Sequence, residues 1–261
     1  MATKSPKKRV LFVGSFKRQA KDGSVGGQMF ACLTLIDSNL SEKVEWLLID
    51  STADSNKGNS LINRLFKAIR RLSIFKYHCI FSRVDTCLIF TADGLSFVEK
   101  GLMVLIASVL GKKTILSPRS GLVVNDLKNS GFMRWYIPFV LKLCNVVVCQ
   151  GESWKVFYRK LVTKNKEKFV VVQNWIDGAS YFELSRNKEV EPIILFLSWV
   201  DRNKGILDLI NAVNRLKESH PKLKLHIAGD GKAMDESRDL VETRVDCPVA
   251  PTGPFHSDPT W

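Results

Sequence analysis

The stretch FLSWVDRNKGILDLINAV, residues 196–213, changes its hydrophobic pattern halfway along. It begins as a short apolar run, typical of a buried β-strand, and ends with apolar residues at the spacing of an amphipathic α-helix. The polar turn between them carries Asp201, Arg202, Lys204 and Gly205. In α/β folds, ligands bind outside the carboxyl ends of strands, where the N–H groups of the next helix attract anions. The turn is therefore predicted to bind an anion, and the alternative is an exposed turn with solvated cations.

Two further features of the turns support this prediction. Lys204 would supply a cation suited to phosphate, and Gly205 would let the backbone approach the ligand closely. A second turn carries Gly229, Asp230 and Gly231 directly after the strand-like run LKLHIA and before another helical pattern. A tight turn with positive φ explains one glycine, whereas two glycines around an acid favour a loop that faces a ligand.

Strand-like and helix-like patterns alternate outward from this stretch along the chain. The strand-like runs are nearly continuous Val, Ile and Leu, which is typical of a parallel sheet covered on both faces. Strands are expected at 9–16, 44–50, 86–92, 112–117, 145–150, 168–174, 193–200 and 222–229. Helices are expected at 28–40, 60–78, 95–111, 131–144, 152–162, 205–220 and 233–242. The predicted fold class is α/β, with two Rossmann-like doubly wound domains.

A polar segment, SRNKEVEP, interrupts the alternation at residues 185–192 and is interpreted as a linker. We therefore predict an N-terminal domain at 1–184 and a partial C-terminal domain at 193–261. The C-terminal part has two clear strands and a weaker candidate around residues 245–249, whereas a Rossmann-like fold uses about six. The second domain is therefore expected to be incomplete.

The composition narrows the class of partner. The chain has 261 residues and a net charge of +13, which favours an anionic partner such as nucleic acid, an anionic membrane surface or a phosphorylated small molecule. Its six cysteines form no C-x-x-C pair and its four histidines no metal-binding pattern, so we predict buried reduced thiols and no metal or other cofactor. The longest apolar run, residues 101–111, is too short to span a membrane, and a soluble protein is expected.

A glycine-rich loop is also predicted in the first domain. Gly14 follows the first strand, and Gly23, Gly26 and Gly27 precede the first helix. The spacing is not G-x-G-x-x-G, so it does not support dinucleotide binding. We interpret this longer loop as one that closes over a substrate.

Four segments together resemble glycosyltransferase family 4, the retaining enzymes that use nucleotide sugars and have the two-domain GT-B fold. The segments are GSVGGQMF at 23–30, FVVVQNWIDGASYF at 169–182, ILFLSWVDRNKGILDLINAV at 194–213 and LKLHIAGDGK at 223–232. The resemblance implies that the donor diphosphate is held by Lys204, Arg202, Gly205, Gly229, Asp230 and Gly231. It also implies a substrate loop containing Gly26 and Gly27, with Asn174 in the family's usual place before the second domain.

The sequence departs from the family pattern in three places. Ser198 and Trp199 stand where members usually have a Gly-Arg pair, and the neighbouring Arg202 is the candidate substitute. Arg119, in LSPRSG, stands about where many members have a histidine, and we assign it as the candidate catalytic residue. An arginine can hold a phosphate but is a poor proton shuttle. The family's two-glutamate motif would lie beyond residue 261, so we expect a C-terminally truncated chain that does not complete a transfer by itself.

The segment SLINRLFKAIRRLSIFKYH, Ser60–His78, is predicted to be an amphipathic helix with several bases. One interpretation is a core-packed helix with a basic solvent face. The other is an interfacial helix on anionic lipid, which suits an enzyme with a lipid-linked acceptor.

The resemblance implies a hexosyl-type transferase of bacterial surface polysaccharide synthesis. Its partners would be a nucleotide sugar and a saccharide or lipid-linked acceptor, and its location the cytoplasm or the inner face of the cytoplasmic membrane. Two alternatives remain open. One is a non-catalytic remnant that keeps only acceptor or membrane binding, and the other, ranked lower, is a nucleic-acid-binding protein, for which the sequence has no recognised motif.

Overall fold

A computed structural model describes residues 7–17, 27–52, 61–176 and 192–244. The chain divides into two compact units, Met1–Phe182 and Glu183–Trp261. The sequence placed the end of the first domain at residue 184. The predicted linker, except Pro192, and the candidate strand at 245–249 lie outside the described residues.

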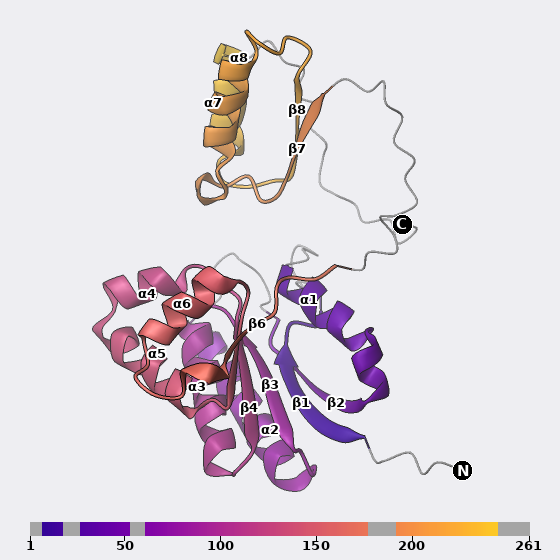
Figure 1. The fold of residues 1–261 in the computed structure, drawn as a ribbon, viewed down its shortest axis with the longest axis vertical. Helices are drawn as coiled ribbons and strands as arrows, with labels where there is room; N and C mark the ends of the chain where they lie inside the picture. The colour runs from indigo at the N-terminus through magenta and orange to yellow at the C-terminus, as the bar shows by residue number, and fades with distance from the viewer. Residues whose placement is uncertain (1–6, 18–26, 53–60, 177–191, 245–261) are drawn as a thin grey trace. The chain divides into compact units, whose positions relative to one another are not determined.

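The first unit is built on one six-stranded sheet (Figure 1). All its strand pairs are parallel, in the order β2-β1-β3-β4-β5-β6. The strands are β1 (Lys8–Gly14), β2 (Val44–Asp50), β3 (Thr86–Thr91), β4 (Lys113–Pro118), β5 (Val146–Cys149) and β6 (Phe169–Val171). This order reverses direction beside β1, as in doubly wound folds, so the predicted α/β fold class is confirmed.

Helices cover both faces of this sheet. They are α1 (Gly27–Ile36), α2 (Leu61–Phe81), α3 (Gly94–Val109), α4 (Val123–Asn129), α5 (Gly131–Leu143) and α6 (Glu152–Lys160), with 3-10 turns η1 (Asn39–Glu42) and η2 (Lys166–Lys168). Successive residues of a strand point to opposite faces. Phe12 therefore packs with Cys32 of α1, whereas Leu11 and Val13 join the cluster that contains residues of α2, α3 and α5.

The sequence did not predict α4, which is a short and mostly polar helix. Pro138 lies inside α5. The side chain of Ser130 caps α5 by accepting a hydrogen bond from the N–H of Met133 at 3.3 Å. A residue of this type at this position satisfies one of the free N–H groups of the first turn.

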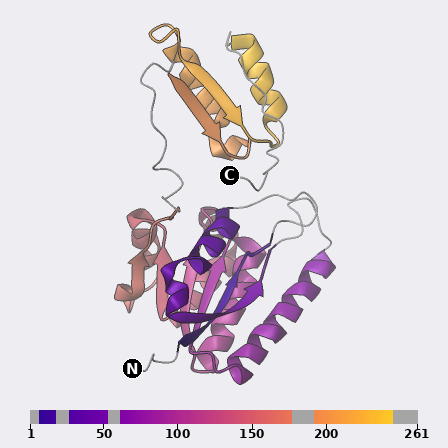
Figure 2. The ribbon, with the colours of Figure 1, turned by 90° about the vertical axis from the view of Figure 1, so that its right-hand side faces the viewer.

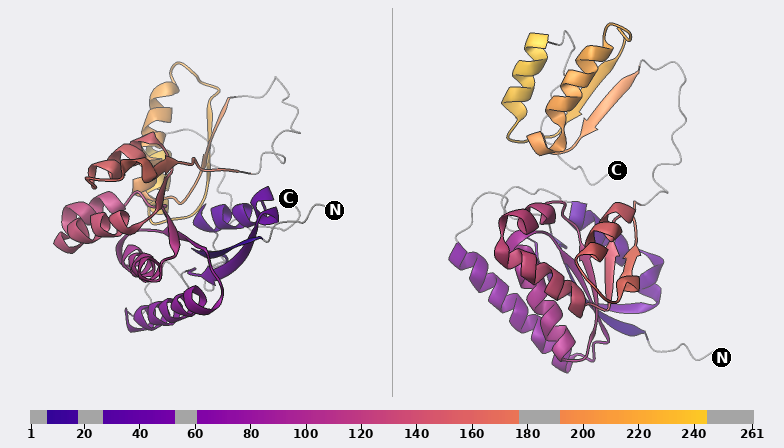
Figure 3. Two further views of the ribbon diagram at one scale, coloured as in Figure 1. Left: turned by 60° about the horizontal axis from the view of Figure 1, so that its bottom comes forward. Right: turned by 60° about the vertical axis from the view of Figure 1, so that its left-hand side comes forward.

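The second unit contains a parallel pair of strands, β7 (Ile193–Leu197) and β8 (Lys224–Ala228). The 3-10 turn η4 (Arg202–Lys204) and the helix α7 (Ile206–Leu216) follow β7, and the helix α8 (Met234–Arg244) follows β8. Both helices pack on one face of the strand pair (Figure 3). On β7, Ile193, Leu195 and Leu197 are exposed, alternating with half-buried residues. The described part of this unit therefore has two of the roughly six strands expected of such a fold.

The five described cysteines are all buried, as the sequence predicted, and Cys247 lies outside the described residues. Among the residues that the structure describes, no helix is long and apolar enough to cross a membrane.

Candidate functional site

The carboxyl ends of the six strands of the first unit meet at one edge of the sheet. At the end of β2, one carboxylate oxygen of Asp50 accepts hydrogen bonds from the N–H of Phe16 at 3.0 Å and from the hydroxyl of Thr52 at 2.6 Å. The Thr52 hydroxyl also lies 2.9 Å from that of Ser15. Asp50 thereby fixes the segment that leads from β1 into the predicted glycine loop. Gly26 lies outside the described residues, and Gly27 begins α1 with open space around its Cα.

Arg119 lies directly after β4 at the same edge, held between two aromatic rings. Its guanidinium carbon is 5.0 Å from the ring centroid of Phe90 and 5.1 Å from that of Trp175. Its Nη2 donates a hydrogen bond to the side-chain oxygen of Asn174 at 3.0 Å. Burial lowers the pKa of Arg119, yet an arginine stays charged in proteins. The side chain is therefore an oriented cation rather than a proton carrier.

Asn174 links the ends of three strands. Its side-chain oxygen also accepts a hydrogen bond from Nε2 of Gln150, at 2.7 Å. The next residue, Trp175, donates from its indole N–H to the hydroxyl of Thr34 on α1, at 2.8 Å. The structure thus brings together Arg119 and Asn174, which the sequence singled out separately. Sequence reasoning missed Gln150, although its position directly after the strand-like run NVVVC was a usable signal.

The predicted diphosphate turn of the second unit lies between β7 and α7. Lys204 is exposed at the end of η4, and Gly205 adopts a left-handed conformation with φ of 77°. A Cβ at Gly205 would meet nothing within 4 Å. Glycine is therefore favoured here by its positive φ, and a close approach of this backbone to a ligand stays a prediction.

Arg202 has a partner within the second unit. Its Nε and Nη2 donate to the two carboxylate oxygens of Glu236 on α8, at 2.9 and 2.6 Å. Both side chains are substantially exposed, so the ion pair contributes little stability. However, it orients the guanidinium towards α8. Arg202 is the candidate substitute for the family arginine that is absent here. To hold a diphosphate, its guanidinium must either contact the phosphate while it stays paired with Glu236 or release Glu236.

The turn between β8 and α8 packs directly against the β7–η4 turn. The N–H of Val200 donates to the carbonyl of Asp230 at 2.9 Å, and the N–H of Lys232 donates to a carboxylate oxygen of Asp201 at 3.1 Å. A Cβ at Gly229 would strike the carbonyl oxygen of Ser198, and one at Gly231 would strike that of Val200. The two glycines are therefore required by contact between the turns, a reason that the sequence reading did not include.

Lys232 is a cation that sequence reasoning did not single out. It is exposed and follows Gly231, and its backbone bond to Asp201 fixes it beside the turn that carries Lys204. The carboxyl edge of the second unit therefore presents two lysines on turns held together by hydrogen bonds. Such an edge can bind an anion without a metal ion. Among the described residues, no group of three or more potential metal ligands is placed to hold one.

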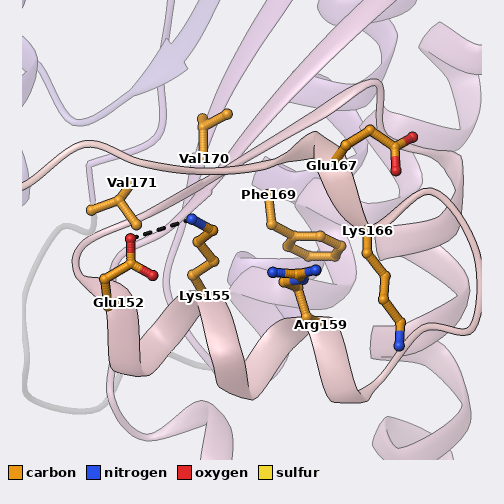
Figure 4. A pocket seen from close by; sticks show the side chains of 8 residues that line it. All are labelled: Glu152, Lys155, Arg159, Lys166, Glu167, Phe169, Val170 and Val171. Atoms are coloured by element: carbon orange, nitrogen blue, oxygen red, sulfur yellow. Dashed lines mark hydrogen bonds and ion pairs between the residues drawn. The ribbon is translucent and has the colours of Figure 1, made fainter.

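A hollow of about 520 Å³ lies along α6 and β6 (Figure 4). It is lined by Lys155, Arg159, Lys166, Glu152, Glu167 and three apolar residues of β6. Lys155 contacts Glu152 at 3.2 Å, as the dashed line shows. None of the site residues predicted from the sequence lines this hollow, so it is not the predicted site.

Comparison with known families gives a match that covers the described part of the second unit. The sequence model of the family described as "Glycosyl transferases group 1" matches residues 179–244. No curated protein sequence matches the chain. The family match contains η4, both glycine turns and all the described strands of the second unit.

Solved structures share the fold at low sequence identity. One is the E. coli structure described as "Trehalose-6-phosphate from E. coli bound with UDP-2-fluoro glucose", with a TM-score of 0.56, 11% identity, and coverage of 91% of this chain and 69% of that one. Another is a glycosyltransferase from Rickettsia africae ESF-5, with a TM-score of 0.50, 16% identity, and coverage of 91% and 65%. TarM of S. aureus also matches, with a TM-score of 0.48 and 14% identity; the match covers 66% of this chain, which spans 34% of the length of TarM.

The chain has the mostly parallel α/β fold of the GT-B glycosyltransferases. Its residues 179–244 match a glycosyltransferase family.

Proposed function

We propose that the protein transfers a sugar from a nucleotide-diphosphate sugar to a saccharide acceptor. The observation that carries this proposal is the position of Lys204. It ends a 3-10 turn at the carboxyl end of β7, within the segment that matches the glycosyltransferase family. The E. coli structure with the same fold has UDP-2-fluoro glucose bound, which supports a nucleotide sugar as the donor.

The proposed chemistry needs the leaving diphosphate to be stabilised as its charge develops. Lys204 and the free N–H groups of the first turn of α7 both present positive charge at this edge. Lys232 adds a second cation on the neighbouring turn. Preorganised donors of this kind stabilise a transition state without reorganisation during the reaction. No metal is required by this account.

The first unit is proposed to hold the acceptor. Arg119 is kept in one orientation by Phe90, Trp175 and Asn174 at the carboxyl edge of the sheet. We propose that Arg119 binds and orients a group of the acceptor, because a guanidinium does not shuttle protons. An acceptor carried on a lipid, in bacterial surface polysaccharide synthesis at the inner face of the cytoplasmic membrane, is the finer part of the proposal.

Nucleotide binding tests the proposal. UDP, GDP and ADP are titrated into the isotope-labelled protein, and the amide NMR signals of residues 201–206 and 229–233 are followed. Shifts confined to these two turns are expected with at least one nucleotide. No shift with any nucleotide would contradict the proposal and favour the non-catalytic alternative.

Arg119→Lys tests the acceptor site. The charge is retained, but the stacking between Phe90 and Trp175 and the fixed bond to Asn174 are lost. We expect transfer to fall by about tenfold to a hundredfold, since a misplaced positioning group costs on the order of a hundredfold. Arg9→Lys is the matched control, because Arg9 also makes fixed hydrogen bonds, to Ser82 and Glu45, at the amino end of β1. If the two variants were equally active, Arg119 would not be part of the acceptor site.

A further inference from the structure

The helix α2 lies on the outside of the first unit (Figure 2). Several of its large apolar side chains are exposed and form a stripe along it. The residues of the stripe share one helix face in two groups, Ile62 to Ile69 and Tyr77 to Ile80, with the polar Ser73 and Lys76 between them. Their exposed fractions are 77% for Ile62, 63% for Leu65, 70% for Phe66, 53% for Ile69, 58% for Tyr77 and 47% for Ile80. Single exposed apolar residues are ordinary, but six on one face of a helix indicate a surface that another body covers.

The packed face of α2 is a different one. Phe75 and Cys79 are buried in the core of the first unit, and Leu72 packs against them. Arg71 is also directed inward, donating to both carboxylate oxygens of Glu99 on α3 at 2.6 and 2.9 Å. One face of the helix therefore packs in the core of the first unit, and the stripe remains exposed.

The charge of α2 indicates what covers the stripe. The helix has 21 residues and no Asp or Glu, and its bases Arg64, Arg70 and Lys76 are exposed. A second copy of the helix would bring like charges together, which opposes pairing of this chain with itself. An anionic lipid surface complements both features, since acyl chains accept the apolar stripe and headgroups accept the bases.

We propose that α2 docks the first unit on an anionic lipid bilayer, lying in the plane of the headgroups. At about 1.5 Å per residue the helix is about 30 Å long, so it offers an extended line of contact. Tyr77 is of the residue type enriched at the membrane–water interface. The inference names a partner for the proposed transferase, but its test uses neither nucleotide nor sugar, so the two proposals can fail separately.

Vesicle co-sedimentation tests the proposal with two variants of the chain. Vesicles of phosphatidylcholine with phosphatidylglycerol are compared with vesicles of phosphatidylcholine alone. We expect binding to the anionic vesicles to weaken as salt screens the charges. A triple variant, Arg64→Gln, Arg70→Gln and Lys76→Gln, should lower the partition coefficient by roughly a hundredfold. A second triple variant, Ile62→Ser, Phe66→Ser and Ile69→Ser, should also release the protein. All six positions are exposed, so circular dichroism should show the same fold.

A matched control separates this surface from net charge. Lys155→Gln, Arg159→Gln and Lys166→Gln remove the same charge from the hollow beside α6. This variant should sediment with anionic vesicles like the natural sequence, and an equal loss in both charge variants would overturn the proposal. Phe66→Trp should be quenched by brominated lipid, and the absence of quenching would overturn insertion. Sedimentation velocity tests the alternative occupant, a second copy of the chain. A dimer that dissociates in the serine variant, together with no binding to vesicles, would show that a second copy covers the stripe and would also overturn the proposal.

Discussion

In a form of the protein that completes the transfer, Lys204→Ala is expected to lower the rate of sugar transfer by about ten- to a thousandfold, the range for losing one preorganised electrostatic contact. Lys204 is exposed at the end of η4, directly before the glycine that turns the chain into α7. Without the charge of Lys204, only the N–H groups of the first turn of α7 and Lys232 would stabilise the departing diphosphate. The rate is measured as nucleoside diphosphate released with saturating acceptor, and the affinity for free UDP, GDP or ADP by calorimetry.

Two controls separate this effect from general loss of charge. Lys217→Ala removes a lysine at the opposite end of α7, at its C-cap, and should leave the rate unchanged. Arg202→Ala should have a smaller effect than Lys204→Ala, because Glu236 already holds the guanidinium. An unchanged rate in Lys204→Ala would remove Lys204 from the donor site, and a rate lost equally in all three variants would indicate damage to the whole second unit.

The strands of the first unit were predictable because their sequences are short, nearly continuous apolar runs. The run Val44–Asp50 was predicted with the observed bounds, and β3 differs from its predicted range by one residue. Length and composition together distinguish such runs from helices, since most of them are short and contain β-branched residues. By contrast, α4 was missed because a short helix of mixed polarity, VVNDLKN, has no periodic pattern long enough to recognise.

The parts of the site that could not be predicted are contacts between distant segments. Arg119 and Asn174 lie 55 residues apart in the sequence, and only the shared sheet edge brings them within hydrogen-bonding distance. Gly229 and Gly231 were read as features of one turn, whereas each is required by a carbonyl of another turn. Likewise, the spacing of apolar residues in α2 predicts a stripe, but it does not tell which stripe packs inward.

The second large effect is expected for a buried ion cluster between α2 and α3. Glu99 is 8% exposed and contacts both Arg71, at 2.6 Å, and Lys100, at 3.2 Å; Lys100 is 4% exposed by its side chain. Burial alone would raise the pKa of Glu99, but hydrogen bonding from Arg71 and the charge of Lys100 outweigh it and lower that pKa. For Lys100, burial prevails over the attraction of Glu99 and lowers its pKa. Glu99 is therefore the counterion of both Arg71 and Lys100. Loss of its charge leaves the buried Lys100 without a counterion.

Glu99→Gln should destabilise the first unit by about 3–5 kcal/mol, the usual cost of removing one partner of a buried ion pair. Hydrogen exchange of peptides from β3 and β4 measures this unit separately from the second. Glu45→Gln is the control, because Glu45 pairs with Arg9 in an exposed salt bridge and should cost less than about 1 kcal/mol. Equal losses in the two variants would contradict a structural role for the buried cluster.

The pH dependence gives an independent check of the same assignment. Because the folded pKa of Glu99 is lowered, the stability that it contributes is present above its unfolded pKa, about 4.3, and is lost as the pH falls through the folded value. The stability gap between the natural sequence and Glu99→Gln should therefore close in acid. At alkaline pH the variant should recover, because the folded state releases the proton of Lys100 more easily than the unfolded state does. A gap that stays constant from acid to alkaline pH would mean that the lost stability comes from packing rather than charge.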